Sequence, residues 1–142
     1  MNGHQHVIDL MHPGVVTCHA DTPVTDIVKQ MTENRIHALA VVGPQDELLG
    51  VVSQSDLLNA GFVEPYERHF EEMRAWQLMT SPAYSVGPFT SLPDAVQIMT
   101  QHNLHRLVVI AAEGPQPNRP IGILSVTDLV DYLGKTVAGA AT

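Results

Sequence analysis

The feature that most constrains this chain is a phrase that occurs twice. The stretch "GVVSQSDLL" runs from Gly50 to Leu58, and "GILSVTDLV" runs from Gly122 to Val130. Both stretches contain a glycine, two aliphatic residues, a serine, two variable residues, an aspartate and further aliphatic residues. Similarity at a fixed spacing predicts a repeated supersecondary unit. The fold must therefore build one local structure twice.

The duplication extends well beyond this phrase. Residues 10–42 align with residues 78–110 at a shift of 78 − 10 = 68 positions. The shift grows to 122 − 50 = 72 positions after "AAEGPQPNRP", a proline- and glycine-rich loop in which four extra residues cost little. The aligned pairs include Leu10/Leu78, Met11/Met79, Thr22/Thr90, Asp26/Asp94, Val28/Val96, Met31/Met99, Thr32/Thr100, His37/His105, Leu39/Leu107 and Val41/Val109.

Each copy predicts the element order β-α-β-β-α. The first helix begins at "TP", with Thr22 as N-cap and Pro23 at the first helical position, and Thr90 or Ser91 caps its counterpart. The continuous apolar runs "ALAVV" and "RLVVIAA" predict strands that are buried on both faces. A further strand follows in "LLGVVS" or "IGILS", and a closing helix in "SDLLNA" or "TDLVDYLG". The fold class is therefore α/β.

The copies set the expected boundaries of the repeats. We assign repeat 1 to residues 7–61 and repeat 2 to residues 77–135, joined by a connecting helix over residues 62–76. Residues from about Thr136 onward look like a frayed tail. Because a unit with only two helices cannot bury its sheet alone, we expect the repeats to pack on each other.

Composition excludes several classes of function. Seven basic and fifteen acidic residues give 7 − 15 = −8, which argues against nucleic-acid binding because a phosphate backbone requires a basic surface. The apolar runs are too short to span a bilayer, and "MNGHQHVIDL" lacks the pattern of a signal peptide. The single Cys18 gives no disulfide framework, so we expect a cytoplasmic protein.

The repeated phrase allows two interpretations. In the first, Ser53 with Asp56, and Ser125 with Asp128, are capping boxes that only begin the closing helices. In the second, they cap the helices and also bind a ligand, because a serine hydroxyl, free N–H groups and a carboxylate at a helix N-terminus suit a phosphate and a ribose diol. The preceding glycine favours close approach of a ligand or of another backbone segment.

The duplicated units, each with the phrase Gly-h-h-Ser-x-x-Asp (h, aliphatic), resemble tandem CBS domains, the pair called a Bateman module. The resemblance covers the chain from about Val7 to Gly134. It implies an α/β fold of two β-α-β-β-α CBS repeats packed with pseudo-twofold symmetry. It also implies clefts between the repeats that bind AMP, ADP, ATP or S-adenosylmethionine.

The same resemblance implies the roles of the motif residues. Asp56 and Asp128 are expected to bind the ribose hydroxyls, and Ser53 and Ser125 are expected to lie near the phosphates. Each motif would then supply part of a ligand site.

Further binding residues are expected before the buried strands. "IHALAVV" and "LHRLVVI" resemble the stretch that carries phosphate-contacting His and Arg in the nucleotide-sensing subunit of AMP-activated protein kinase, which makes His37, His105 and Arg106 phosphate candidates. The alternative for the two histidines is a half-buried filler at the end of a strand. Val16 and Tyr84 occupy the place of the apolar adenine wall, although Tyr84 also suits a plain core position.

These expectations define a function. We expect a regulatory, energy-sensing module that binds an adenosine nucleotide, needs no cofactor, forms a homodimer and signals to an unknown effector protein in trans. The alternatives are a ligand-free scaffold or dimerisation module, or an S-adenosylmethionine binder. No nucleophile and base pattern predicts an enzyme. The histidines at positions 4 and 6 lack a surrounding ligand cluster, so no metal site is expected.

Overall fold

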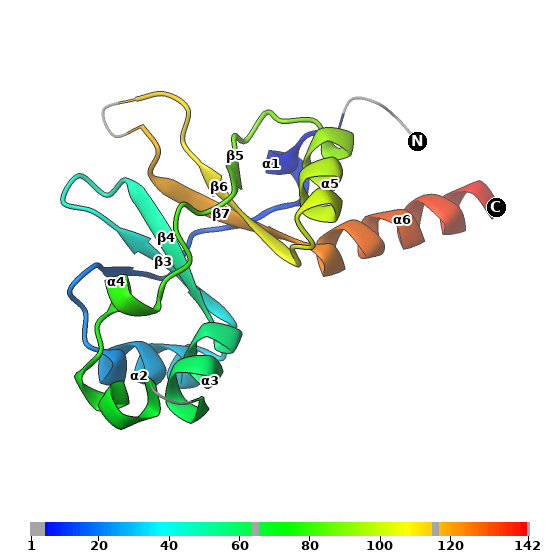
Figure 1. Cartoon of the computed structure of the whole chain (residues 1–142). Helices are drawn as coiled ribbons and strands as arrows, with labels where there is room; N and C mark the ends of the chain where they lie inside the picture. Colours follow the sequence, from blue (N-terminus) through cyan, green and yellow to red (C-terminus); the bar gives the residue numbers. More distant parts are fainter. Residues whose placement is uncertain (1–4, 64–65, 115–116, 142) are drawn as a thin grey trace. The chain divides into compact units, whose positions relative to one another are not determined.

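The computed structural model of this chain describes residues 5–63, 66–114 and 117–141. The chain packs as two compact units, each with its own sheet and its own hydrophobic core (Figure 1). The first, which we call the central unit, spans Val15–Ala83. The second, the terminal unit, combines Met1–Gly14 with Tyr84–Thr142.

The central unit follows the predicted β-α-β-β-α order. Its sheet has the strand order β2-β3-β4, in which β2 runs parallel to β3 and β4 runs antiparallel to it. Its elements are β2 (Thr17–His19), α2 (Val24–Asn34), β3 (Ala38–Val42), β4 (Leu48–Ser53), α3 (Gln54–Phe62), the 3₁₀ helix η1 (Tyr66–Glu72) and α4 (Ala75–Leu78).

The terminal unit repeats this order and adds a short N-terminal segment. Its sheet has the order β1-β7-β6-β5, with β5 parallel to β6 and the other neighbours antiparallel. Its elements are α1 (Val7–Leu10), β1 (His12–Pro13), β5 (Ser85–Val86), α5 (Leu92–Gln101), β6 (Arg106–Ile110), β7 (Pro120–Ser125) and α6 (Val126–Ala141).

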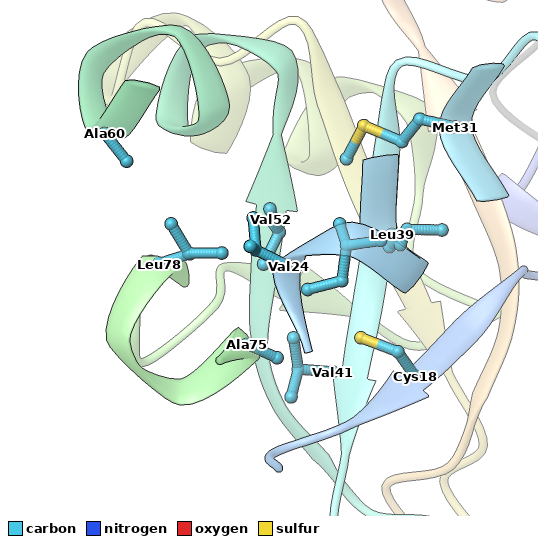
Figure 2. Packing of buried hydrophobic residues seen from close by; sticks show 10 residues of the cluster. Cys18, Val24, Met31, Leu39, Val41, Val52, Ala60, Ala75 and Leu78 are labelled. Carbon is cyan, nitrogen blue, oxygen red and sulfur yellow. The ribbon is translucent and has the colours of Figure 1, made fainter. Parts of the chain in front are cut away.

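The core of the central unit lies between its sheet and the helices α2, α3 and α4. Val24, Ile27 and Met31 recur at helical spacing and are all buried, whereas Val28 at the same spacing is partly buried. Figure 2 shows Val24 and Met31 close to Leu39 of β3. The apolar run of β3 is buried from Leu39 to Val42, which confirms a strand covered on both faces.

The segment between the repeats differs from the single helix predicted over residues 62–76. It forms η1 and α4, with Met73 and the extended residue Arg74 between them. The N–H of Val24 donates to the carbonyl of Met73 over 2.9 Å, and Arg74 forms a β-bridge with Pro23. The prediction of one continuous helix is wrong, because Met73 accepts the N–H of Val24 and Arg74 pairs with Pro23, both at the start of α2.

Two other predicted helix ends are wrong. Thr22 does not cap α2, which begins at Val24 after Pro23; its Oγ1 accepts the N–H of His19 over 3.0 Å instead. Helix α6 continues past Thr136 to Ala141, where the sequence suggested a tail. The segment after Thr136 is rich in alanine, the residue with the highest helix propensity. Ser91 does cap α5, by accepting the N–H of Asp94 over 3.2 Å.

The compact units divide the chain differently from the sequence repeats. Segment α1–β1, which opens the first repeat, belongs to the terminal unit, where His12 pairs with Ile123 of β7. Residue Thr80, which opens the second repeat, belongs to the central unit, where it pairs with Val51 of β4. Each sheet is therefore completed by a segment that the sequence assigns to the other repeat. Among the described residues, no helix combines the length and apolar character needed to cross a bilayer.

Candidate functional site

In the central unit, the repeated phrase builds a reciprocal cap at the start of α3. Ser53 is the last residue of β4, and its Oγ accepts the N–H of Asp56 over 3.2 Å. Asp56 Oδ2 accepts the N–H of Ser53 over 2.8 Å and its hydroxyl over 2.9 Å. The capping-box prediction is confirmed, since each residue satisfies a backbone N–H of the other.

The terminal unit builds the same arrangement at the start of α6. Asp128 Oδ2 accepts the N–H of Ser125 over 2.9 Å, and Ser125 Oγ accepts the N–H of Asp128 over 3.1 Å. Both motif serines and both motif aspartates are partly buried. Capping therefore uses one carboxylate oxygen of each aspartate, Oδ2, and leaves Oδ1 for another partner.

The glycine of each phrase lies where another backbone segment crosses the strand. A Cβ on Gly50 would lie 2.7 Å from the carbonyl oxygen of Thr80 and 2.8 Å from Met79 Sδ. A Cβ on Gly122 would lie 2.8 Å from the carbonyl oxygen of His12 and 2.6 Å from the Sδ of the methionine before it. Neither approach leaves room for a side chain. Of the two reasons for the glycine that the sequence allowed, the structure shows close approach of backbone.

These crossing segments also reach Oδ1 of each motif aspartate. Thr80 Oγ1 donates to Asp56 Oδ1 over 3.4 Å, and His12 Nε2 lies 2.7 Å from Asp128 Oδ1. Neither residue was predicted from the sequence. The alignment of the two copies could have indicated them, because His12 and Thr80 occupy matched positions directly after the repeated Leu-Met pair.

The predicted phosphate residues lie beside the motif serines. The carbonyl of His37 accepts the N–H of Gln54, the first residue of α3, over 3.0 Å. The carbonyl of His105 accepts the N–H of Val126, the first residue of α6, over 2.9 Å. Both histidine side chains are exposed, and so is Arg106, which pairs with the motif serine across β6 and β7. The filler interpretation of the histidines required half-buried side chains and does not fit.

Val16 and Tyr84, the two predicted adenine-wall residues, have different surroundings. Val16 is partly buried against the central core, and its carbonyl accepts the N–H of Ala40 over 3.2 Å. Tyr84 is 48% exposed, and its ring stacks on His102 with a centroid distance of 4.1 Å. A plain core role for Tyr84 is therefore wrong, whereas Val16 packs like an ordinary core residue.

Other reactive side chains contribute little to this region. No group of three or more His, Cys, Asp or Glu side chains within the described ranges is placed to hold a metal ion. The histidine at position 4 lies outside the described residues, and His6 contacts Asp9. Cys18 is buried in the central core, where desolvation raises the pKa of its thiol to about 11. The thiol is therefore protonated at neutral pH, and a thiol in this form is a poor nucleophile.

Comparison with known families gives this arrangement a name. The family model described as "CBS domain" matches twice, at residues 7–62 and 75–135. The chain belongs to the CBS domain family. The resemblance drawn from the motifs is confirmed, and each of the two phrases lies within one of the two matched CBS domains.

Individual relatives agree with this assignment. The chain is 32% identical over 117 residues to the mitochondrial CBS domain-containing protein CBSX3 of Arabidopsis thaliana, covering 80% of this chain but 53% of the relative. The chain thus spans about half the length of that protein. A structure of CBSX2 in complex with AMP matches with a TM-score of 0.75 and 26% identity, over 92% of this chain and 97% of that chain.

A second solved structure is a CBS domain pair in complex with 5′-methylthioadenosine and S-adenosyl-L-methionine. It matches with a TM-score of 0.77 and 16% identity, over 93% of this chain and 98% of that chain. At this identity it supports the fold alone. CBS domain pairs are regulatory ligand-binding modules, and members of the family bind different adenosine compounds.

Each CBS unit therefore brings its motif serine and aspartate to one helix N-terminus, beside the backbone of the predicted histidine. In the central unit these are Ser53, Asp56 and the backbone of His37, joined by Thr80; we call this group the Asp56 site. The corresponding group in the terminal unit, the Asp128 site, consists of Ser125, Asp128, His105, Arg106 and His12.

Proposed function

We propose that this protein is a regulatory module that binds an adenosine nucleotide, AMP, ADP or ATP, and passes the bound state to a partner protein. Membership of the CBS family supports the regulatory role, and the AMP complex of a structural neighbour supports the class of ligand. AMP and ADP are favoured over ATP, because a triphosphate needs more donors than His37, His105 and Arg106 supply.

One observation carries the proposal: the same polar group is built at the start of both α3 and α6. In each unit a serine hydroxyl, a partly buried carboxylate and the N-terminus of a helix meet beside a histidine-bearing strand end. A carboxylate accepts hydrogen bonds from neighbouring hydroxyls, as in a ribose diol, and a helix N-terminus favours an anion. The two features together match the two polar parts of a nucleotide.

The phosphate end differs between the two sites. Arg106 opens β6 beside the Asp128 site, whereas the matched residue of the Asp56 site is Ala38. An arginine donates a bidentate, charge-assisted pair of hydrogen bonds to phosphate, which alanine cannot do. Phosphate recognition is therefore stronger in the Asp128 site than in the Asp56 site.

The proposed partners bind through apolar helix faces. Leu58 on α3, Trp76 on α4 and Val130 and Leu133 on α6 are all exposed, which suits a homodimer or an effector contact. The neighbouring Leu57 and Leu129 instead pack against their own units. A reducing, cytoplasmic location stays a prediction that rests on the single cysteine.

Calorimetric titration of the whole chain with AMP, ADP, ATP and S-adenosylmethionine tests the proposal. Asp56→Asn and Asp128→Asn keep an oxygen for the cap but remove the charge that the ribose hydroxyls need. Each substitution should weaken nucleotide binding at its own site by about tenfold to a hundredfold, the usual effect of losing a hydrogen bond to a charged group.

Asp94→Asn is the matched control. Asp94 lies three residues after the N-cap Ser91 of α5, as the motif aspartates lie after their serines, but it belongs to neither site. Its substitution should leave affinity unchanged. Absence of heat with every compound would overturn the proposal and leave the scaffold function. If S-adenosylmethionine were the one compound that produced heat, it would be the ligand in place of a nucleotide.

A further inference from the structure

The two motif aspartates differ most in the partner of Oδ1. His12 Nε2 lies 2.7 Å from Asp128 Oδ1, a short distance for a charge-assisted contact. Thr80 Oγ1 lies 3.4 Å from Asp56 Oδ1, at the long limit for a hydrogen bond. The Asp128 side chain is only 11% exposed, whereas that of His12 is 75% exposed. His12 therefore lies on the solvent side of a largely covered carboxylate.

The sheet itself holds His12 in this position. His12 pairs with Ile123 of β7, and its carbonyl oxygen crosses close above Gly122. The same strand ends at Ser125, three residues before Asp128. Strand pairing thus positions the backbone of His12, and its exposed side chain reaches Asp128 from there.

The charged groups around His12 leave Asp128 as its partner. Strand β7, which packs against β1, carries no ionisable side chain in "PIGILS". Helix α6 carries Asp128, Asp131 and Lys135, and helix α1 carries Asp9, which accepts the N–H of His6. Among the described residues, Asp128 is the acidic group that lies within ion-pair distance of the His12 ring.

From this geometry we propose that His12 competes with the ligand for the carboxylate of Asp128 and so determines the affinity of the Asp128 site. This inference rests on the proposed function, in which that carboxylate accepts the ribose hydroxyls. Oδ2 accepts the N–H of Ser125 and Oδ1 contacts His12, so a ribose diol competes with the imidazole for the acceptor positions of this carboxylate. Thr80 presents a weaker obstacle at the Asp56 site.

The competition has a definite pH dependence. Histidine gains its charge as the pH falls through the range of about 8 to 5, and the protonated ring forms the stronger contact with a carboxylate. The protonated ring is the stronger competitor for Asp128, so we expect ligand binding at this site to tighten as the pH rises. A phosphate bound against His37 or His105 would produce the opposite slope.

The test compares AMP affinity at pH 6, 7 and 8 by calorimetry in a pair of variants. The first protein carries Asp56→Asn, so that AMP binding reports on the Asp128 site. The second carries Asp56→Asn together with His12→Thr, which places at position 12 the residue found at the matched position, Thr80, of the other unit. AMP ionisation and any contribution of His105 are common to both proteins and cancel in the comparison. At pH 6, His12→Thr should bind AMP about two- to fivefold more tightly, a gain that vanishes near pH 8.

The reciprocal change completes the test. Asp128→Asn leaves the Asp56 site, and adding Thr80→His should weaken AMP binding there at pH 6 more than at pH 8. Equal pH profiles with and without His12→Thr would overturn the inference while leaving nucleotide binding intact. Weaker binding in His12→Thr at every pH would also overturn it, because His12 would then be a ligand contact. Absence of AMP binding in every protein, including the unsubstituted chain, would overturn the proposed function instead.

Discussion

The Asp56 and Asp128 sites share their backbone and differ in the side chains around it. In both, a glycine admits a crossing segment, a serine ends a strand, and an aspartate three residues on closes the cap. The surrounding residues diverge: Thr80 at one site is replaced by His12 at the other, and Ala38 by Arg106. Duplication has preserved what the fold requires, whereas the residues that we propose to contact a ligand vary.

This difference shows which positions are constrained by packing. Where an added Cβ would lie 2.7–2.8 Å from a backbone oxygen of the crossing segment, the strand accepts only glycine, whichever ligand is bound. An exposed residue such as Arg106 carries no such restriction. The paired units therefore allow each substitution to be compared with its counterpart in the same chain.

The largest expected effect tests whether the two cores are equivalent. Leu39 and Leu107 occupy matched positions on β3 and β6, and each is 1% exposed. Replacing either leucine with alanine removes buried methyl groups and leaves a cavity, which should lower the free energy of unfolding by about 2–5 kcal/mol. Denaturant unfolding of both variants measures it. If the free energy of unfolding fell by less than about 1 kcal/mol in only one variant, the two cores would not be equivalent.

The crossing at the motif glycines should give the next largest effect. Gly50→Ala and Gly122→Ala each place a Cβ within 2.8 Å of a backbone oxygen, which should cost about 1–3 kcal/mol of stability. Gly134→Ala is the control, because a Cβ at this position in α6 meets nothing within 4 Å. It should raise stability by roughly 0.5–1 kcal/mol, since glycine weakens a helix interior. Thermal unfolding of the three variants measures these changes. A Gly50→Ala or Gly122→Ala variant as stable as the unsubstituted chain would contradict the prediction.

Phosphate recognition should separate the two sites by a smaller amount. Arg106→Ala should weaken AMP binding at the Asp128 site by about tenfold, while Ala38→Arg should strengthen binding at the Asp56 site. Removing Arg106 should affect adenosine far less than AMP, because adenosine has no phosphate. Equal losses for both compounds would place Arg106 away from the phosphate.

The smallest effect concerns Cys18, whose matched residue in the terminal unit is Val86. Burial raises the pKa of the Cys18 thiol from 9.0 to about 11. Between these values the unfolded chain loses the proton while the folded chain keeps it, so unfolding free energy should fall as the pH rises from 9 to 11. Cys18→Val, which installs the matched residue, should show a shallower decline. Identical declines in urea-unfolding series would refute the assignment.

The sequence alone predicted the local structure well. The buried strands β3 and β6, a cap on α5 at Thr90 or Ser91, and both capping boxes were predicted from residues close together in the chain. Hydrogen bonds three residues apart and the periodicity of apolar side chains depend on short-range geometry. The alignment of the two copies then indicated which family to expect.

The helix predictions that were wrong depend on contacts outside the segment itself. The predicted connecting helix is broken because Met73 and Arg74 pair with the start of α2. Thr22 caps no helix because its hydroxyl accepts the N–H of His19. Helix propensity describes a segment by itself, and tertiary hydrogen bonds override it at these points.

What the sequence determined by itself is the repeated unit: its element order, its capped helices and the motif aspartates. Only the tertiary structure decided that the opening segment of each repeat joins the compact unit of the other. That exchange brings His12 to Asp128 and Thr80 to Asp56, and it explains the motif glycines. The physical reason is that a carboxylate at a helix N-terminus takes its first partner from its own backbone, within one turn. Its second partner comes from whichever strand packs across it, and strand pairing joins residues at any distance along the chain.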